Sequence, residues 1–361
     1  MSRIGLLVYD VSLVGGAERV AINLANELSK SNKVVVISVS CSKHAPETLD
    51  HKVITRTISN QVGSISAHFF QYAYKLRKII KDEGLDILLA ITAGVVSLAL
   101  FAKRGTNTKI VYCEHSNLEN KTYGKKHELR QLIGAKKADV VVPLTERDKT
   151  NFVKMFHVPE EKLVVIPNWY TPIRNTENKY KKESQKIISV GRLEKVKGYD
   201  YIIECAKKVL ESHPTWEWDI YGDGSMHEEL QKRINDEKID RLHLKGNVKD
   251  IQEQFGKYAF LVMTSLYEGL PLSLLEAQSA NLPIISFDCP TGPSEIINNG
   301  ENGILVAKGN SDELQKAVER LMESEDAREK MSAHARDNLD YYSKERIMNI
   351  WENTITKTIS Q

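Results

Sequence analysis

The sequence predicts an α/β protein made of two consecutive, doubly wound domains, and three observations support this. Apolar runs rich in Val and Ile alternate with segments of helical periodicity, which is typical of parallel sheets buried on both faces. The alternation stops at a polar segment, 168–185, and starts again after it. The chain has 361 residues, whereas single cores stop growing at about 250–300 residues, so two cores are expected.

The first half contains six apolar runs that we interpret as strands. They are 4–9, 33–40, 86–92, 109–115, 139–145 and 163–167. Between the first two runs, small and apolar side chains recur at the spacing of one helix face. These side chains belong to Ala17, Val20, Ala21, Leu24, Ala25 and Leu28.

The segment 168–185 has no hydrophobic periodicity, and we interpret it as a linker. Six further runs follow at 186–191, 216–222, 242–248, 259–265, 283–288 and 303–307. The chain ends in a helical pattern whose apolar face consists of Ile347, Ile350, Trp351 and Ile355. We therefore expect one domain at 1–170, a second at 171–340 and a terminal helix at 341–361.

The composition is that of an ordinary globular protein, with 41% hydrophobic and 27% charged residues. No apolar run reaches the ~18 residues of a membrane span, and the N-terminus has no signal-peptide pattern. The four cysteines form no C-x-x-C pair; they are Cys41, Cys113, Cys205 and Cys289. These features predict a cytoplasmic protein with reduced, mostly buried thiols.

The net charge of +2 conceals an asymmetry between the two halves. Residues 1–170 hold 24 Lys and Arg against 16 Asp and Glu, a net +8, and residues 171–361 hold 26 against 32, a net −6. A basic half suggests an anionic partner for that half.

Ligands of open α/β sheets bind outside the carboxyl ends of the strands, so the loops there carry the candidate residues. GRLEKVKG (191–198) follows a predicted strand and contains Arg192 and Lys197. Two cations at this position suit a diphosphate. Two solvated charges on a loop are the alternative.

Two further loops of the second half follow predicted strands. Gly222 and Gly224 in YGDGS would let a flat ligand approach the backbone, although a plain tight turn has the same pattern. GNV (246–248), which includes Val248, follows the next strand and could line the same pocket.

The stretch SLYEGLPLSLLEA (265–277) places one carboxylate in a loop and another in the helix after it. Pro271 suits a helix start, so Glu268 precedes the helix and Glu276 lies inside it. The helix N-terminus presents unpaired N–H groups to hydroxyls or phosphates. The alternative is one capping glutamate and one ordinary helix glutamate.

In the first half, Gly15 and Gly16 precede a predicted helix and form a second possible anion cradle. His115 ends a predicted strand; a structural role for it is as plausible as a role in binding. The chain has no D-x-D motif and no His/Cys cluster with zinc spacing, so no metal is expected.

In this order and separation, GGAER, GRLEKVKG, YGDG and EGLPLSLLE resemble the retaining glycosyltransferases of family 4. The resemblance covers nearly the whole chain and rests mainly on the E-x7-E and G-R-x4-K-G elements. It implies the GT-B fold, in which two Rossmann-like domains face each other across a cleft. The segment 287–306 further resembles members that build bacterial surface polysaccharides from UDP-sugars.

The resemblance implies a role for each candidate residue. Those implied in catalysis are Arg192, Lys197, Glu268 and His115. Those implied in donor binding are Gly15, Gly16, Gly222, Val248, Gly269, Leu270 and Glu276. The two cations would hold the diphosphate, the helix glutamate the ribose, and the loop glutamate and the histidine the sugar.

The implied reaction moves a hexose or N-acetylhexosamine from a nucleotide sugar, with UDP as the expected nucleotide, to a glycan or lipid-linked acceptor. The second domain would bind the donor and the first the acceptor. Departure of the nucleoside diphosphate needs positive charge rather than a strong acid, and the two cations would supply it without a cofactor. The sugar would keep its anomeric configuration, and neither glutamate need be a nucleophile.

Two basic stretches, 74–81 and 120–137, lie in the first half. In relatives such surfaces dock on anionic membranes, so we expect peripheral association with the inner face of the plasma membrane and no nucleic-acid partner. A solvated helix face is the alternative. A nucleotide-sugar epimerase and a non-catalytic sugar-nucleotide binding protein remain as alternative functions.

Overall fold

The computed structural model describes residues 1–13, 15–40, 46, 48–60, 63–172 and 180–361. The chain divides into two compact units, each of which is considered by itself. Unit 1 comprises Met1–Asn168 together with Ile347–Gln361, and unit 2 comprises Trp169–Arg346. The sequence predicted borders after residues 170 and 340.

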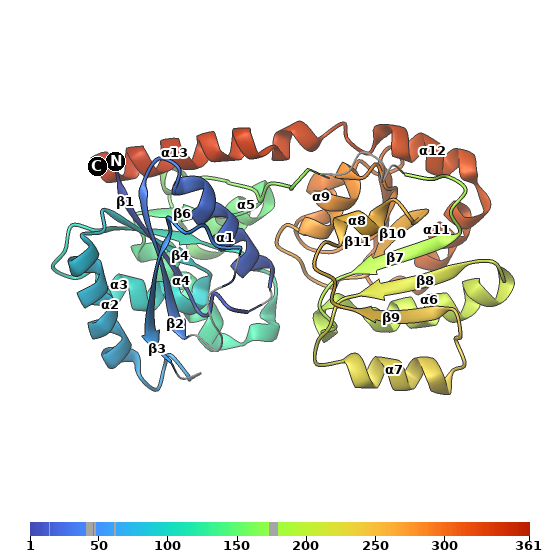
Figure 1. The fold of residues 1–361 in the computed structure, drawn as a ribbon, viewed down its shortest axis with the longest axis horizontal. Helices are drawn as coiled ribbons and strands as arrows, with labels where there is room; N and C mark the ends of the chain where they lie inside the picture. The colour runs from blue at the N-terminus through green and yellow to red at the C-terminus, as the bar shows by residue number, and fades with distance from the viewer. Residues whose placement is uncertain (14, 41–45, 47, 61–62, 173–179) are drawn as a thin grey trace. The chain divides into compact units, whose positions relative to one another are not determined.

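Unit 1 contains a parallel sheet with the strand order β3-β2-β1-β4-β5-β6, with helices on both faces (Figure 1). Its strands are β1 (Arg3–Val8), β2 (Lys33–Ser40), β3 (Ile54–Ser59), β4 (Ile87–Ile91), β5 (Lys109–Cys113) and β6 (Val140–Val142). Its helices before residue 168 are α1 (Gly16–Leu28), α2 (Phe69–Glu83), α3 (Ala93–Ala102), α4 (Lys125–Lys137) and α5 (Glu146–Phe156). Short 3-10 turns occupy Lys121–Tyr123 and Glu160–Lys162.

One strand of unit 1, β3, was not predicted from the sequence. β3 lies at the edge of the sheet and pairs only with β2. Its central residues, Thr55, Arg56 and Thr57, are exposed. An edge strand that is open to solvent lacks the continuous apolar run by which the other strands were predicted.

The predicted strand at 163–167 is wrong. This segment runs beside β6, and Leu163 forms a single bridge with Val141. The N–H of Ile166 donates to the carbonyl oxygen of Pro143 at 3.1 Å. The ladder does not continue because Pro143 and Pro167 have no N–H to donate.

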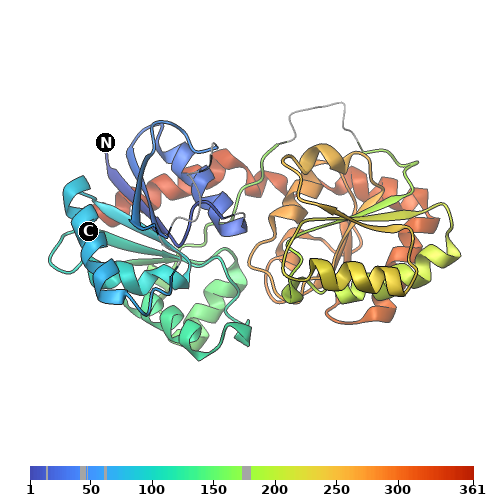
Figure 2. The ribbon, with the colours of Figure 1, turned by 60° about the horizontal axis from the view of Figure 1, so that its bottom comes forward.

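Unit 2 contains a second parallel sheet, with the order β12-β11-β10-β7-β8-β9. Its strands are β7 (Lys186–Val190), β8 (Glu217–Tyr221), β9 (Leu242–Gly246), β10 (Phe260–Met263), β11 (Ile284–Asp288) and β12 (Gly303–Ala307). Its helices are α6 (Tyr199–Ser212), α7 (His227–Asp236), α8 (Gln252–Phe255), α9 (Leu272–Ser279), α10 (Pro293–Ile296), α11 (Ser311–Glu323) and α12 (Glu325–His334). Short 3-10 turns occupy Lys195–Lys197 and Leu339–Tyr342. All six strands predicted for this half are confirmed, and helices cover both faces of the sheet (Figure 2).

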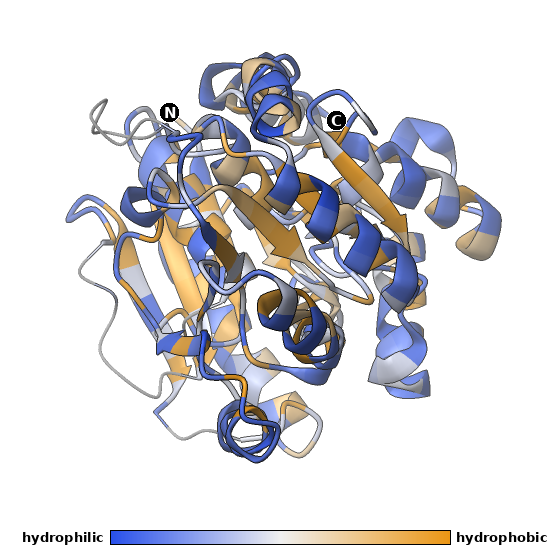
Figure 3. Ribbon diagram, turned by 90° about the vertical axis from the view of Figure 1, so that its right-hand side faces the viewer, coloured by the Kyte–Doolittle hydropathy of each residue, from blue (hydrophilic) through white to orange (hydrophobic). Residues whose placement is uncertain are grey.

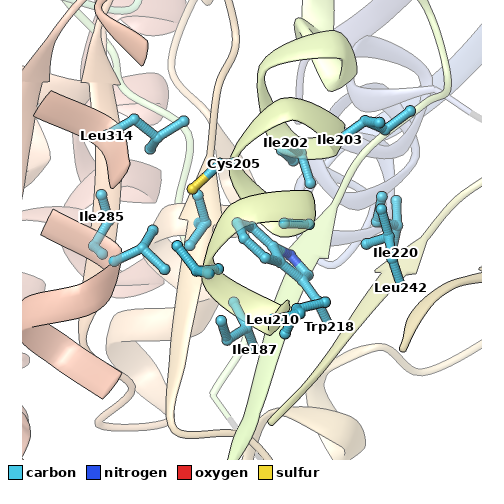
Figure 4. Packing of buried hydrophobic residues seen from close by; sticks show 14 of the residues in the cluster. Ile187, Ile202, Ile203, Cys205, Leu210, Trp218, Ile220, Leu242, Ile285 and Leu314 are labelled. Atoms are coloured by element: carbon cyan, nitrogen blue, oxygen red, sulfur yellow. The ribbon is translucent and has the colours of Figure 1, made fainter. Parts of the chain in front are cut away.

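The core of unit 2 lies between its sheet and the helices α6 and α11. Trp218 of β8 is fully buried beside Leu210 of α6 and Ile187 of β7 (Figure 4). Its indole N–H donates to the Ser189 hydroxyl at 3.0 Å, which satisfies the one polar atom of the ring.

The strands are the most hydrophobic part of the ribbon, whereas most helices are hydrophilic on one side (Figure 3).

The last helix, α13 (Lys344–Ser360), spans the border between the two units. Its buried residues Ile347, Trp351 and Ile355 belong to the predicted apolar face. The helix has 17 residues, and among the described residues no helix is both long enough and apolar enough to cross a membrane.

Two sequence predictions fall partly or wholly on undescribed residues. The predicted linker includes 173–179 and one of the four thiols is Cys41, and these lie outside the described residues. The other three cysteines, Cys113, Cys205 and Cys289, are buried and unpaired, as expected.

Each sheet has one point at which the strand order reverses. In unit 2, β7 and β10 are neighbours at this point, and in unit 1, β1 and β4 are neighbours. Loops that leave such a pair diverge to opposite faces, which opens a crevice for a ligand.

Candidate active site

In unit 2, the loops after β7 and β10 contain three of the predicted site residues. Arg192 and Lys197 follow β7, and Glu268 follows β10. The sequence predicted a site at strand ends, and the strand order brings these particular two loops together at the reversal point.

Hydrogen bonds to backbone carbonyl oxygens hold the two loops against each other. The Thr264 hydroxyl donates to the carbonyl oxygens of Lys197 and Gly198 at 3.1 and 2.9 Å. The N–H of Leu266 donates to the carbonyl oxygen of Val196 at 2.8 Å. A Cβ added at Gly198 would lie 2.3 Å from the carbonyl oxygen of Thr264, so this approach requires glycine.

Lys197 and Glu268 form an ion pair across these loops. The Lys197 Nζ donates to the Glu268 Oε1 at 2.6 Å, and the two side chains are 22% and 10% exposed. The charges are therefore paired and only partly hydrated. The family resemblance implied separate roles for these residues and did not predict this contact.

Arg192 lies in a different environment from Lys197. Its side chain is exposed, and within the described residues it has no ion-pair partner. The neighbouring carboxylate of Glu194 instead accepts the Ser225 hydroxyl at 2.7 Å and the Ser225 N–H at 3.2 Å. The loop thus offers one accessible guanidinium and one engaged ammonium group.

The loop that carries Glu268 rests on a segment that the sequence did not single out as part of the site. The Thr291 hydroxyl donates to the carbonyl oxygens of Glu268 and Gly269 at 2.7 and 3.1 Å. Gly292, at φ +85°, packs so closely that an added Cβ would lie 2.7 Å from the carbonyl oxygen of Gly269. The Thr-Gly-Pro sequence after a strand was the available signal for this support.

Glu276 lies inside α9 and is 2% exposed. The Gln252 side-chain amide donates to its Oε1 at 3.1 Å. Gln252, at the start of α8, was missed because nothing in the sequence links the two helices. Leu270, between the two glutamates, is 5% exposed, and Pro271 is the N-cap of α9 rather than its first residue.

The glycines of YGDGS bring backbone close to backbone. Gly222 has φ +135°, and an added Cβ would lie 2.0 Å from the carbonyl oxygen of Gly191. An added Cβ at Gly224 would lie 2.5 Å from the carbonyl oxygen of Leu193. The protein's own loop therefore requires both glycines, whatever ligand approaches them. Val248, beyond β9, is 38% exposed.

The remaining predicted residues belong to unit 1. Gly15 is the N-cap of α1 and Gly16 its first residue, and a Cβ at Gly16 would meet no atom within 4 Å. A Cβ at Gly15 would meet the Glu18 carboxylate, which is the far end of a flexible side chain. The amino end of α1 thus leaves backbone space beside Gly16.

His115 follows β5, next to a buried carboxylate. Burial lowers the pKa of His115 to about 4, so its imidazole is neutral at pH 7. Glu114, 1% exposed, accepts hydrogen bonds from Tyr112, Gln131 and Ser116. These bonds fix the backbone on which His115 sits. Sequence reasoning overlooked Glu114, although a carboxylate at a strand end was visible.

The acidic and histidine side chains of the described residues do not gather into a metal site. No group of three or more His, Cys, Asp or Glu in these ranges is arranged to hold an ion.

Comparison with known proteins gives two matching family models, which adjoin along the chain. Residues 14–172 match "Glycosyltransferase Family 4", and residues 172–338 match "Glycosyl transferases group 1".

Full-length relatives include an uncharacterized glycosyltransferase of Haemophilus influenzae, 27% identical over 358 residues, with 98% of this chain and 100% of the relative covered. The amylovoran biosynthesis glycosyltransferase AmsD of Erwinia amylovora is 27% identical over 365 residues, with the same coverage of 98% and 100%. Both relatives align with this chain from end to end.

Among solved structures, a Staphylococcus aureus TarM mutant in complex with Fondaparinux, α-GlcNAc-glycerol and UDP superposes with a TM-score of 0.85. It has 16% sequence identity, and 98% of this chain and 100% of that chain are covered. At this identity the likeness shows the fold, which is the expected GT-B fold. With both family models matched in sequence, the chain belongs to the glycosyltransferases that these models describe.

Proposed function

We propose that the protein is a retaining glycosyltransferase that moves a hexose or N-acetylhexosamine from a UDP-sugar to a glycan or lipid-linked acceptor. The acceptor would be part of a bacterial surface polysaccharide. The observation that carries the proposal is the gathering of Arg192, Lys197 and Glu268 where the strand order of unit 2 reverses, with Glu276 in the helix that follows.

The donor would be held mainly by unit 2. Arg192 and Lys197 bind the diphosphate, and Glu276 accepts the ribose hydroxyls. Glu268 accepts hydroxyls of the sugar, beside the N–H groups of Gly269 and Leu270. Cationic side chains suit a diphosphate, and buried carboxylates suit vicinal hydroxyls, since each accepts two hydrogen bonds.

The family resemblance implies a role for further residues of each unit. In unit 2, Gly222 and Val248 would lie near the base. In unit 1, Gly15 and Gly16 would offer backbone N–H groups at the start of α1 to a diphosphate, and His115 would bind the sugar as a neutral imidazole.

The chemical step depends on charge stabilisation. Negative charge builds on the leaving diphosphate, and the two cations of the loop after β7 stabilise it. The acceptor hydroxyl attacks the anomeric carbon from the face that the diphosphate leaves, and the departing phosphate takes the hydroxyl proton. The new bond then keeps the anomeric configuration of the donor. No carboxylate is required as a nucleophile, and no metal is required for departure.

Two comparisons support the donor and the pathway. The TarM structure holds UDP together with an α-linked N-acetylglucosaminyl glycerol, which is the linkage expected when a UDP-sugar with an α-linkage reacts with retention. AmsD is a glycosyltransferase of amylovoran biosynthesis. The first comparison supports a UDP-linked donor, and the second supports a role in polysaccharide biosynthesis.

A donor screen tests this proposal. Thermal unfolding should shift upward with the correct nucleotide sugar, because a ligand that binds only the folded state stabilises it. Incubation with that donor and an acceptor, followed by linkage analysis, should give an α-linked product. Isomerised sugar in the absence of acceptor would indicate an epimerase, and binding without any turnover would indicate a non-catalytic binding protein.

The acceptor side of the proposal includes reversible docking of unit 1 on an anionic membrane surface. α4 exposes Lys125, Lys126 and Leu129, the last at 55%. On α2, Phe70 and Tyr74 are 74% and 73% exposed. Both helices pack against α3, and we propose that their exposed basic and apolar side chains form one docking surface. Each basic residue near an anionic surface contributes about 1 kcal/mol.

Vesicle co-sedimentation tests the docking. Binding should require anionic lipid and should weaken in high salt, because the Debye length falls from ~10 Å at 0.1 M to ~3 Å at 1 M. Neutral substitution of four lysines of α4 should reduce binding; they are Lys125, Lys126, Lys136 and Lys137. The matched control substitutes four exposed lysines of unit 2, Lys208, Lys232, Lys316 and Lys330. Equal loss in both variants, or equal binding to neutral vesicles, would contradict the assignment.

A further inference from the structure

The ion pair between Lys197 and Glu268 engages one of the two cations assigned to the donor diphosphate. The two charged groups lie 2.6 Å apart, and their side chains are 22% and 10% exposed. Partly buried pairs are screened by salt less than fully exposed pairs are. Lys197 is thus bound to a carboxylate, whereas the side chain of Arg192 is exposed.

Both partners of this pair are held in place by their own loops. Lys197 lies in a 3-10 turn, directly before the residue that Thr264 anchors. Glu268 lies in a loop whose carbonyl groups accept the Thr291 hydroxyl. Because both backbones are fixed, breaking the pair requires side-chain rotation rather than loop movement.

We propose that Glu268 competes with the diphosphate of the nucleotide for Lys197, and that this competition promotes release of the nucleotide product. The proposal rests on the proposed function, in which Lys197 binds the diphosphate and Glu268 the sugar. It adds that each of these two contacts with the ligand replaces the ion pair. Lys197 and Glu268 therefore exchange partners during each catalytic cycle.

The competition distinguishes the intact donor from the product. A complete nucleotide sugar offers hydroxyls to Glu268 and a diphosphate to Lys197, so both ends of the ion pair gain new partners. The product nucleotide has no sugar and satisfies Lys197 alone, which would leave Glu268 partly buried without its cation. Taking the cation away from a partly buried carboxylate is costly, so Glu268 attracts Lys197 back. Part of the sugar's binding energy is thereby used to free Lys197 for the leaving group.

Calorimetric titration of UDP into a Glu268→Gln variant tests the proposal. Glutamine keeps the size and an oxygen acceptor but removes the charge that holds Lys197. UDP should bind about three- to tenfold more tightly than to the wild type, where tenfold corresponds to about 1.4 kcal/mol. Turnover of the UDP-sugar should fall at the same time. Unchanged or weaker UDP binding by this variant would overturn the competition.

A second Lys–Glu pair in unit 2 provides a matched control. Lys186 Nζ lies 2.7 Å from Glu217 Oε2, at the first residues of β7 and β8 and hence at the opposite edge of the sheet. Glu217→Gln removes the same charge from the same kind of pair. It should leave UDP affinity unchanged, and equal tightening in this control would show a general charge effect that overturns the proposal.

A double-mutant cycle separates this inference from the proposed function. Lys197→Met should weaken UDP binding, and adding Glu268→Gln to it should then have no further effect. If Lys197→Met leaves UDP affinity unchanged, the assignment of Lys197 to the diphosphate fails. If Lys197→Met weakens binding but Glu268→Gln tightens it equally in both backgrounds, only the competition fails.

Discussion

The carboxyl edges of the two sheets carry ionisable groups in opposite arrangements. In unit 2, opposite charges meet, since Lys197 and Glu268 are paired at 2.6 Å. In unit 1, two carboxyl groups lie close enough to interact, because the charge of Glu114 acts on Asp148. Both residues are 1% exposed. Burial and, less strongly, the negative charge of Glu114 together raise the pKa of Asp148 to about 7.

The two edges therefore use their charged residues differently. The unit 2 groups belong to loops at the reversal of strand order, where exchange with a charged ligand is possible. The unit 1 carboxylates accept hydrogen bonds from their own chain: Ser116 and Gln131 donate to Glu114, and Asn151 donates to Asp148. The positive charge of unit 1 lies elsewhere, in part on the exposed face of α4.

The largest expected effect concerns the cations of unit 2. Lys197→Ala and Arg192→Ala should each reduce turnover by about 10²–10³, the usual cost of removing one group that stabilises transition-state charge. Lys186→Ala, at the amino edge of the same sheet, is the control and should retain activity. Wild-type turnover in both test variants would remove these cations from the mechanism. Steady-state kinetics with the UDP-sugar measures the effect.

Glu276→Ala should give the next largest effect, on nucleotide affinity. Ribose hydroxyls would lose a charged acceptor that is buried, a loss of roughly 1.5–3 kcal/mol. Calorimetric titration with UDP measures it, and Gln252→Ala serves as a comparison because it removes one hydrogen-bond donor to Glu276 and keeps the carboxylate. An affinity equal to that of the wild type in Glu276→Ala would show that the ribose is bound elsewhere.

In unit 1 we expect a pH effect on stability. The folded-state pKa of Asp148, about 7, lies above its ordinary value of 3.8. The folded state therefore holds this proton more tightly, and stability falls as pH rises from about 4 to about 7. Each pKa unit corresponds to about 1.4 kcal/mol. Asp148→Asn removes the titration.

Thermal unfolding at pH 5 and pH 8 tests this expectation. The variant should lose less stability than the wild type between the two pH values. Asp139→Asn is the control, because hydrogen bonds from Ile110 and Lys103 lower the pKa of Asp139 despite its partial burial. Asp139 therefore stays ionised between pH 5 and pH 8, and its variant should keep the pH dependence of the wild type. An identical pH dependence in the wild type and Asp148→Asn would contradict the assignment.

For the last test we expect no effect: the turnover of the enzyme should be unchanged by EDTA. The reason is the presence of two cations in the loop after β7 and the lack of a D-x-D motif in the sequence. Turnover is measured before and after chelation. Complete loss in EDTA that magnesium or manganese restores would mean that a metal stabilises the leaving group and that the role of the cations in unit 2 is secondary.

The strands were predictable where both faces are buried. Eleven of the twelve strands of the described chain coincide with continuous apolar runs, because helices cover both sides of a parallel sheet. The exceptions have local reasons. β3 is an open edge strand with exposed Thr55, Arg56 and Thr57, and the run at 163–167 lies beside prolines that interrupt a ladder.

By itself, the sequence determined the fold class, the loops that carry the candidate site residues, and the family, since all three depend on local pattern and on motif spacing. The tertiary structure decided which side chains of the candidate site contact each other. It paired Lys197 with Glu268, placed Thr291 beneath the Glu268 loop, and set Gln252 against Glu276. These contacts join residues 23 to 71 positions apart, and strand order rather than sequence distance brings them together. No local pattern encodes that order, because it follows from how the helices and strands bury their apolar surfaces jointly.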